Sequence, residues 1–291
     1  MNTQNPIIEN CPVCNSSQSS SFLEHSDIAL VRCESCRLVW WKSSPSRVSI
    51  KQYFQDEYIT NENRLTEKFI DYRAQALSRI AFHVKRQVDK TDPELLDLGT
   101  ASGSFLQHLS KHGITSVTGV EPSSYAAESV RRRLGVPVLD GFIEDQSLNN
   151  DSFDVVTCLD TLCLVAEPHI DVAEISRVLK PNGHCFIELP GFHYRMIKGT
   201  GLIGRFLYPD KPGIQLGVHT LYFSKQSLKQ LFEMHDLTMV GAIPIGGPLY
   251  GSSITRWIKR CGFAALAGAY RLLGGKLEIA PKVLYEFRKS S

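Results

Sequence analysis

The sequence has no uninterrupted apolar run long enough to cross a bilayer. Its most apolar late stretch, residues 261–273, is short and contains Arg271, whereas a membrane-spanning helix needs about 20 apolar residues. Residues 1–10 are polar and lack the apolar centre of a secretory signal. We therefore expect a cytoplasmic protein without a transmembrane segment.

The sequence also lacks a strong excess of charge of either sign. Its 32 Lys and Arg residues nearly balance its 30 Asp and Glu residues, which leaves a formal net charge of +2. A field this weak does not attract nucleic acid to the molecule as a whole, and nucleic acid is therefore not expected as a partner. The 43% hydrophobic and 21% charged residues are typical of a globular protein.

Four of the eight cysteines form two closely spaced pairs. The pairs are Cys11-x-x-Cys14 and Cys33-x-x-Cys36, with 18 residues between them. Structural disulfides are not expected in a reducing cytosol, whereas four thiolates can close a tetrahedral zinc site with ligand distances of about 2.3 Å. The spacing predicts a structural Zn²⁺ site in a zinc-ribbon-like module, and two unrelated pairs of free thiols are the alternative.

The remaining cysteines have no paired spacing and lie in apolar surroundings, which is typical of small core residues. They are Cys158, Cys163, Cys185 and Cys261. Cys163 is the exception of interest, because its position in the chain places it near the expected rim of the active site.

Most of the chain alternates between short apolar strands and amphipathic helices. Apolar residues recur at intervals of three and four within 66–88, which predicts a helix that covers the sheet. Strands are then expected at 95–98, 117–120, 136–139, 153–159, 184–189, 237–245 and 283–287, with helices between most of them. This alternation predicts an α/β fold with a Rossmann-like, doubly wound, mostly parallel sheet of about seven strands.

The domain organisation follows from these patterns. Residues 1–45 are expected to form the zinc-ribbon-like module, 46–90 a linker and covering helix, and 91–291 the main domain. Within the main domain, residues 191–217 are rich in glycine and aromatics and too long for a simple connection. They are expected to form a lid-like insertion, with an ordinary surface excursion as the alternative.

The first strand of the main domain runs into a glycine-containing turn that precedes a helix. The turn is Asp97-Leu98-Gly99-Thr100-Ala101-Ser102-Gly103, and Glu121 ends the next strand, 22 positions after Gly99. Such a turn lets a ligand approach the backbone at the carboxyl edge of a sheet. An acidic side chain at the second strand end can bind both hydroxyls of a ribose.

The turn lacks the G-x-G-x-x-G pattern of dinucleotide-binding proteins. A carboxylate at Asp97 would also repel the pyrophosphate that lies over this turn in such proteins. The same carboxylate favours S-adenosylmethionine, which carries an ammonium and a sulfonium. NAD is therefore the weaker candidate, and a turn with no ligand is the remaining alternative.

The loop 97–103, Glu121, the strand 153–157 and the segment Arg177-Val178-Leu179-Lys180-Pro181-Asn182-Gly183 together resemble the class I S-adenosylmethionine-dependent methyltransferases. The resemblance extends from about Tyr53 to the C-terminus. The cysteine pairs and the segment His219-Thr220-Leu221-Tyr222-Phe223-Ser224 resemble more narrowly a bacterial branch that acts on small molecules.

The resemblance implies roles for individual residues. The residues expected to surround the methionine part of the cofactor are Asp97, Gly99, Thr100, Ala101 and Gly103. Glu121 is expected to hold the ribose, Phe142 and Ile143 to flank the adenine, and Asp160 to face the site of methyl transfer. Two departures from the family pattern stand out. Ala101 replaces a glycine, which is acceptable if its φ stays negative, and Cys163-Leu164 replaces a Glu-His pair.

Methyl transfer from a sulfonium needs chiefly alignment of the acceptor, and a general base helps when the acceptor is a hydroxyl or an acidic carbon. The candidate bases are His193, Tyr194 and His219, each of which could instead be a loop or packing residue. We expect methylation of oxygen or carbon on a small molecule, such as a sugar, a glycan precursor or a secondary metabolite. An RNA methyltransferase and a non-catalytic cofactor-binding protein remain as alternatives, and the oligomeric state stays open.

Basic residues border the apolar run near the C-terminus, namely Arg256, Lys259, Arg260 and Arg271. A weak peripheral contact with a membrane is one explanation of this pattern. A helix packed on the main domain with one solvated face is the interpretation that the sequence favours.

Overall fold

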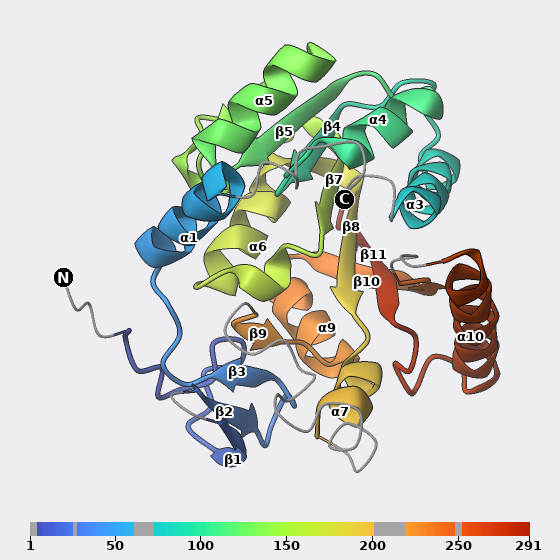
Figure 1. The fold of residues 1–291 in the computed structure, drawn as a ribbon. Coiled ribbons are helices and arrows are strands. Elements are labelled where there is room, and N and C mark those ends of the chain that lie inside the picture. The colour runs from blue at the N-terminus through green and yellow to red at the C-terminus, as the bar shows by residue number, and fades with distance from the viewer. Residues whose placement is uncertain (1–4, 26–27, 61–72, 201–218, 248–251) are drawn as a thin grey trace.

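The computed structural model describes residues 5–25, 28–60, 73–200, 219–247 and 252–291 (Figure 1). A seven-stranded sheet forms its centre, in the order β10-β11-β8-β7-β4-β5-β6. The strands are β4 (Leu95–Leu98), β5 (Val117–Glu121), β6 (Val138–Asp140), β7 (Phe153–Leu159), β8 (Leu179–Pro190), β10 (Leu237–Ile245) and β11 (Lys282–Lys289). The α/β fold with a mostly parallel sheet of seven strands is therefore confirmed.

The strand directions place a crevice near the middle of this sheet. Strands β4 to β8 pair in parallel, whereas β11 runs antiparallel between β8 and β10. The chain leaves β4 for β5 on one side and later returns to place β7 on the other side. In open α/β sheets, ligands bind outside the carboxyl ends of the strands at such a switch point.

Helices cover both faces of the large sheet. One face packs against α3 (Ala74–Gln87), α4 (Ser104–Lys111) and α5 (Ser124–Leu134), whose apolar residues share a core with Leu95, Val155 and Phe186. The other face packs against α6 (Pro168–Val178) and α9 (Lys225–Glu233). Short 3₁₀ turns follow β6 and β7, at η2 (Ile143–Asp145) and η3 (Leu162–Leu164).

Local signals define several helix ends. The side chain of Ser123 accepts a hydrogen bond from the Ala126 N–H at the start of α5, and Gly135 ends that helix with a φ of 67°. Ser224 caps α9 in the same way, through the Ser227 N–H. These are the residue types that satisfy free N–H groups at helix starts and adopt left-handed conformations at helix ends.

The N-terminal cysteine-containing segment adds a second, smaller sheet. It contains β1 (Ser19–His25), β2 (Ile28–Cys33), β3 (Val39–Trp41) and β9 (Leu221–Tyr222), all antiparallel. The last strand comes from the main domain, and the buried residues Leu38 and Trp40 belong to the same apolar core as Leu231 and Phe232 of α9. The N-terminal segment is thus continuous with the main domain in both its sheet and its core.

The segment expected to be a linker contains helix α1 (Arg47–Thr60), which packs against α5. The expected helix over 66–88 is represented by α3, and residues 61–72 lie outside the described part of the chain. The expected lid at 191–217 begins as α7 (Phe192–Thr200), and its remainder from 201 onward also lies outside the described residues. Within the described residues, no helix is both long and apolar enough to span a membrane.

Candidate cofactor and acceptor site

A cavity of about 440 Å³ opens at the carboxyl ends of β4, β5 and β7. Its size lies in the range of small-molecule sites. The sequence-predicted residues that line it are Asp97, Gly99, Thr100, Ala101, Glu121, Phe142, Ile143, Asp160 and His219. Gly103, His193 and Tyr194 are not part of its lining. The fold therefore brings most of the predicted residues, which are spread over more than a hundred positions of the chain, to one cavity.

Two positions of the loop after β4 require glycine for different structural reasons. Gly99 has a φ of +73°, and a Cβ at this position would collide with the side chain of Thr161. Gly103 also has a positive φ, but a Cβ there would meet Val130 and Leu134 of α5. Gly99 thus allows close packing between the loop and Thr161, whereas Gly103 allows close packing between the loop and α5.

The condition under which alanine would replace the glycine without strain, a negative φ at Ala101, is not met, because this residue has a φ of +50°. A side chain other than glycine in the left-handed region costs about 1–3 kcal/mol unless its surroundings hold it there. The Ala101 N–H donates to Oε2 of Glu121 at 2.8 Å. This hydrogen bond joins the loop after β4 to the end of β5, and it offsets part of the strain at Ala101.

Glu121 is buried at the end of β5, with both carboxylate oxygens engaged. Oε2 accepts from Ala101, and Oε1 accepts from the Ser123 N–H at 3.0 Å. Burial raises the pKa of Glu121 to about 7, while these two backbone donors act in the opposite direction. A carboxylate has further acceptor capacity, so this side chain can also receive hydrogen bonds from hydroxyl groups in the cavity.

Asp97 is the second buried carboxylate of the cavity. Its Oδ1 accepts a hydrogen bond from the Thr157 hydroxyl of β7 at 2.7 Å. Burial raises the pKa of Asp97 to about 7, against the effect of hydrogen bonds from Thr157 and Thr100. Among the residues that the structure describes, no cationic side chain shifts the pKa of Asp97 or of Glu121. A cation in the cavity would therefore stabilise the ionised form of both.

Helix α1 forms a wall of the cavity that the sequence did not predict. Ile50, Tyr53, Phe54 and Tyr58 of α1 all line it. Arg47 holds the start of this helix in place, since its guanidinium lies 5.3 Å from the ring centre of Phe142 and binds the Asp171 carboxylate at 3.2 Å. The intervals of four between Ile50, Phe54 and Tyr58 are the signal that could have identified this helical face.

Asp160 lies at the end of β7 in a cluster of paired charges. Its Oδ2 is 2.6 Å from Nζ of Lys282 and 3.9 Å from Nη1 of Arg73, and Glu188 of β8 binds the same two cations. Burial opposes ionisation, but Lys282 and Arg73 hold the pKa of Asp160 well below its usual range. Its backbone has a φ of +61°. Asp160 is thus an ionised residue already neutralised by neighbouring cations, and the sequence patterns did not identify Arg73 or Lys282.

His219 is buried and lies against Arg195 of α7. Nη1 of Arg195 is 3.2 Å from Nδ1 of His219, and the guanidinium lies 4.8 Å from the ring centre of Tyr222. Burial, and to a smaller extent the positive charge of Arg195, lowers the pKa of His219 to about 3. Because a guanidinium only donates, Nδ1 must accept this bond. The neutral ring therefore carries its proton on Nε2.

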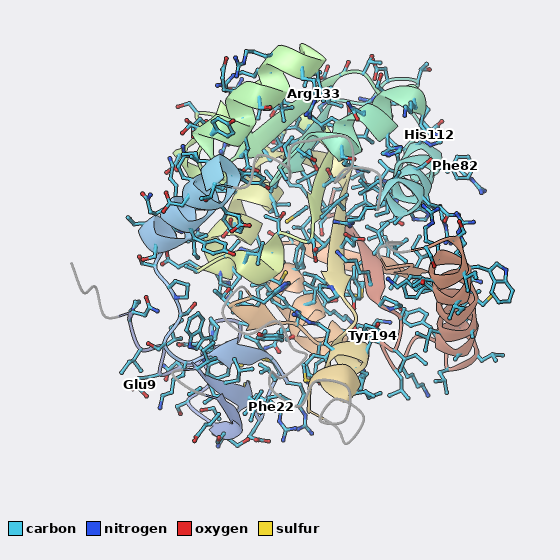
Figure 2. The ribbon with its side chains drawn as sticks, viewed as in Figure 1. Glu9, Phe22, Phe82, His112, Arg133 and Tyr194 are labelled. Carbon is cyan, nitrogen blue, oxygen red and sulfur yellow. The ribbon has the colours of Figure 1, made fainter. Side chains whose placement is uncertain are left out.

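His193 and Tyr194 lie on α7, away from the lining of the cavity. Nδ1 of His193 accepts from the Glu278 N–H at 3.1 Å, and the Tyr194 N–H donates to the Glu278 carbonyl at 3.0 Å. Figure 2 shows Tyr194 at α7, far in that view from Arg133 of α5. The structure thus brings only His219, of the three candidate bases, to the cavity.

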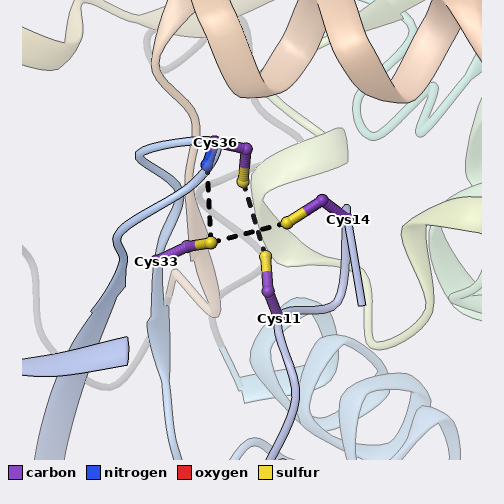
Figure 3. A group of neighbouring side chains, drawn as sticks. All are labelled: Cys11, Cys14, Cys33 and Cys36. Carbon is purple, nitrogen blue, oxygen red and sulfur yellow. Dashed lines mark hydrogen bonds between the residues drawn. The ribbon is translucent and has the colours of Figure 1, made fainter. Parts of the chain in front are cut away.

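The four paired cysteines gather in one place (Figure 3). Their Sγ atoms all lie within 4.8 Å of one another; Cys11 and Cys36 are 3.5 Å apart, and Cys14 and Cys33 are 3.4 Å apart. A tetrahedral zinc site with ligand distances of about 2.3 Å has sulfur–sulfur edges of about 3.8 Å. The donor set and its spacing therefore fit a structural Zn²⁺ ion.

Of the other cysteines, Cys163 is buried at η3, and burial raises the pKa of its thiol above the ordinary value.

Hydrogen bonds connect the cysteine cluster with the side of the cavity that His219 lines. The Ser224 hydroxyl donates to the Cys36 carbonyl at 3.3 Å, and the Trp41 N–H donates to the Thr220 carbonyl at 3.0 Å. Thr220 in turn donates from its N–H to the Cys163 carbonyl at 3.0 Å. Since Thr220 follows His219 directly, the N-terminal module helps to position His219.

Comparison with known proteins decides the family. The profile of the Methyltransferase domain family matches residues 67–242, which is more than half of the chain. The chain belongs to this methyltransferase family. The family resemblance expected from the sequence is thereby confirmed, and the matched region contains every predicted cofactor residue.

The curated relatives of this methyltransferase include two enzymes of ubiquinone biosynthesis. It is 26% identical over 125 residues to the ubiquinone biosynthesis O-methyltransferase of Pasteurella multocida. This alignment covers 38% of this chain and 51% of that protein. It is 32% identical over 102 residues to the mitochondrial ubiquinone biosynthesis O-methyltransferase of Schizosaccharomyces pombe. This alignment covers 33% of this chain and 37% of that protein. The chain thus spans about half, or less, of these relatives.

A solved structure shares the fold over most of the methyltransferase. It is the 1,6-didemethyltoxoflavin-N1-methyltransferase of Burkholderia thailandensis with bound 1,6-didemethyltoxoflavin and S-adenosylhomocysteine. The TM-score is 0.55 at 12% identity, and the alignment covers 93% of this chain and 99% of that one. This likeness concerns the fold alone.

Proposed function

We propose that the protein transfers the methyl group of S-adenosylmethionine to an oxygen atom of a small-molecule acceptor. The observation that carries this proposal is the pair of buried carboxylates, Asp97 and Glu121, on one cavity beside the Gly99 loop. Two carboxylates suit a cofactor that carries an ammonium, a sulfonium and a ribose, and they would repel a diphosphate. Family membership and the two O-methyltransferases among the relatives support the same function.

The residue roles follow from position in the cavity. Asp97 would attract the ammonium of the methionine part, Glu121 would accept from the ribose hydroxyls, and Phe142 and Ile143 would flank the adenine. Gly99, Thr100 and Ala101 would supply the close backbone surface. Gly103 would act indirectly, by letting α5 pack against the loop.

The acceptor we propose is a hydroxylated ring with at least one apolar face. Apolar and aromatic side chains line much of the cavity, including Tyr53, Phe54 and Tyr58 of α1 and Leu162 and Leu164 of η3. Such a wall binds a ring more readily than a sugar covered with hydroxyl groups. The relatives do not favour the alternatives of an RNA methyltransferase or a non-catalytic protein.

Two further parts of the proposal concern zinc and location. The four cysteines would hold one structural Zn²⁺ ion, which would keep the N-terminal module folded against β9. We also propose a cytoplasmic location, because none of the eight cysteines forms a disulfide and reduced cysteines persist in the cytosol.

The cofactor assignment is tested by calorimetric titration of S-adenosylmethionine and of NAD. Asp97 has a pKa of about 7 without ligand, and a cation binds best to its ionised form. Glu121 also has a pKa of about 7, so the affinity for S-adenosylmethionine should rise as the pH rises through 7, by up to about tenfold per pH unit on the acid side for each of the two carboxylates. NAD should bind weakly at every pH.

The variant Asp97→Asn should weaken binding of S-adenosylmethionine and flatten this pH dependence. The exposed carboxylate Asp89 provides the matched control, and Asp89→Asn should behave as the wild type. Tighter binding of NAD than of S-adenosylmethionine would contradict the assignment, as would a pH profile that Asp97→Asn leaves unchanged.

We propose that His219 donates a hydrogen bond to the acceptor oxygen instead of removing its proton. Its Nδ1 accepts from Arg195, so the group left for the acceptor is the Nε2–H. The Nε2–H of His219, together with the positive charge of Arg195 at Nδ1, would favour the ionised form of the acceptor hydroxyl. The proton of that hydroxyl would pass to water. His193 and Tyr194 stay predictions as bases, and their positions outside the cavity do not favour that role.

Two variants distinguish a donor from a base. Glutamine can present an N–H near the position of Nε2, so His219→Gln should keep kcat within about tenfold of the wild type, whereas His219→Ala should lose about 100-fold. A general base would make the two variants equally poor. His193→Gln, measured in parallel, should leave kcat unchanged because His193 does not line the cavity.

A further inference from the structure

Helix α10 (Ser253–Leu272) presents an apolar stripe to solvent. Ile254 is 73% exposed, Trp257 66%, Ile258 59% and Leu272 90%. With Cys261 and Ala265, which are also exposed, these residues recur at intervals of three and four along the helix. Such spacing places them on one face, and exposed apolar residues gathered in this way mark an interaction surface.

The opposite side of α10 holds the helix to the main domain. Tyr270 is buried, and the Phe263 ring lies against Gly246 and Gly247 after β10. Phe263 and Tyr270 are separated by seven positions, two helical turns, and point away from Ile254 and Ile258. The sequence favoured a packed helix with one solvated face. In the structure only Tyr270 of this helix is buried, and the apolar stripe is exposed together with Arg256, Arg260 and Arg271. Figure 1 shows α10 at the edge of the molecule.

The charges of α10 are all of one sign. The helix contains Arg256, Lys259, Arg260 and Arg271 and no acidic residue. At about 100° per residue, Arg256 and Lys259 fall on the side of the helix opposite the stripe, and Arg260 and Arg271 lie between that side and the stripe. An apolar stripe that includes tryptophan, with basic residues on the other side of the helix, is the pattern of a helix that lies in the interface of an anionic membrane. The helix is not apolar enough to span a bilayer, so its place would be on the surface.

We propose that α10 docks the protein on the surface of a membrane that contains anionic lipids. The apolar stripe would enter the boundary between headgroups and acyl chains, Arg260 and Arg271 would extend to lipid phosphates, and Arg256 and Lys259 would add to the attraction by the anionic surface. Nucleic acid would satisfy the charges but leave the stripe exposed. A second copy of the chain would cover the stripe but bring four more cations against the four that are there.

Vesicle flotation tests this proposal with the full-length protein. Vesicles of phosphatidylcholine with about 30% phosphatidylglycerol should carry the protein to the top of the gradient, and phosphatidylcholine alone should not. Trp257 supplies an independent signal, because Trp40 is fully buried and Trp41 half-buried. The emission maximum should shift to the blue when anionic vesicles are added, and brominated lipids should quench it.

Two sets of variants separate the stripe from the charges. Trp257→Ser with Ile258→Ser should weaken the partition by about tenfold or more, and Arg256→Gln with Arg260→Gln by roughly fivefold for each charge removed. The matched control is Phe82→Ser, since Phe82 of α3 is also an exposed aromatic residue (51%) and lies outside α10 (Figure 2).

Three results would overturn the proposal. The first is equal partition onto neutral and anionic vesicles, and the second is binding that both sets of variants leave unchanged. The third is a dimer in analytical ultracentrifugation that forms without lipid and disappears with Trp257→Ser. None of these measurements depends on methyl transfer, so failure here and failure of the proposed activity can be told apart.

Discussion

Replacing Glu121 by alanine should weaken the binding of S-adenosylmethionine by roughly 100-fold or more. In the proposed complex this carboxylate accepts from two ribose hydroxyls, and a hydrogen bond to a charged group contributes about 1.5–3 kcal/mol. Two such bonds correspond to about 100-fold to 10,000-fold in the dissociation constant. The substitution also releases the Ala101 N–H, which Glu121 Oε2 binds at 2.8 Å, so the loop loses the hydrogen bond that holds its strained residue.

The variant Glu121→Gln should lie between alanine and the wild type. Glutamine keeps one acceptor oxygen, but its amide NH₂ then faces either the Ala101 N–H or the Ser123 N–H, which are both donors. Glu128→Gln on the surface of α5 is the matched control and should bind normally. Calorimetry measures the affinity, and circular dichroism shows whether each variant is folded. A folded Glu121→Ala variant that binds within threefold of the wild type would contradict the ribose role.

Loss of one cysteine ligand should slow methyl transfer by about 100-fold and spare cofactor binding. Cys33 is fully buried, its Sγ lies 3.4 Å from that of Cys14, and it accepts the Cys36 N–H. Serine at this position removes a thiolate from the set of four, and a structural zinc site with a missing ligand loses most of its affinity. Metal analysis should give one zinc ion per chain for the wild type and close to none for Cys33→Ser.

The Cys33→Ser substitution should affect the part of the cavity near His219 more than the part near Asp97 and Glu121. The N-terminal module holds β9 through the pairs Val39–Tyr222 and Trp40–Leu221, and His219 precedes this strand. Without zinc the acceptor side loses its support, so kcat should fall by about 100-fold. Asp97 and Glu121 belong to β4 and β5 on the other side, so the dissociation constant of S-adenosylmethionine should change less than about threefold.

Cys261→Ser is the matched control for the metal, because Cys261 is exposed on α10, outside the cluster. It should retain the zinc ion and the activity. Chelation of the wild type should reproduce the loss seen with Cys33→Ser, and added zinc should reverse it. An unchanged metal content in Cys33→Ser would reject the site, and a parallel loss of cofactor affinity and activity would reject its selective link with the acceptor.

The residues that sequence reasoning placed correctly in the cavity share a local signal. Asp97, Gly99 and Glu121 lie where short apolar strands end, and strand ends of a parallel sheet meet at one edge. The paired cysteines are similarly local, since each pair lies within one turn. Neither inference required knowledge of which distant segments touch.

The residues that sequence reasoning missed depend on distant contacts. Arg47 belongs to a segment that the sequence analysis interpreted as a linker, yet it reaches Asp171 of α6, and α1 becomes a wall of the cavity. Lys282 comes from the last strand and neutralises Asp160 of β7. The direction of α7 decides that Arg195 reaches His219 while His193 turns toward Glu278.

The sequence by itself determined the alternating α/β order, the glycine-containing loop between the strand ends that carry Asp97 and Glu121, and the four-cysteine cluster. It could do so because periodicity, turn chemistry and metal-ligand spacing act over a few residues. Only the tertiary structure decided that α1 closes the cavity, that Arg195 sets the tautomer of His219, and that the apolar stripe of α10 faces solvent. These outcomes depend on which elements pack together, and packing is decided by the whole set of surfaces to be buried.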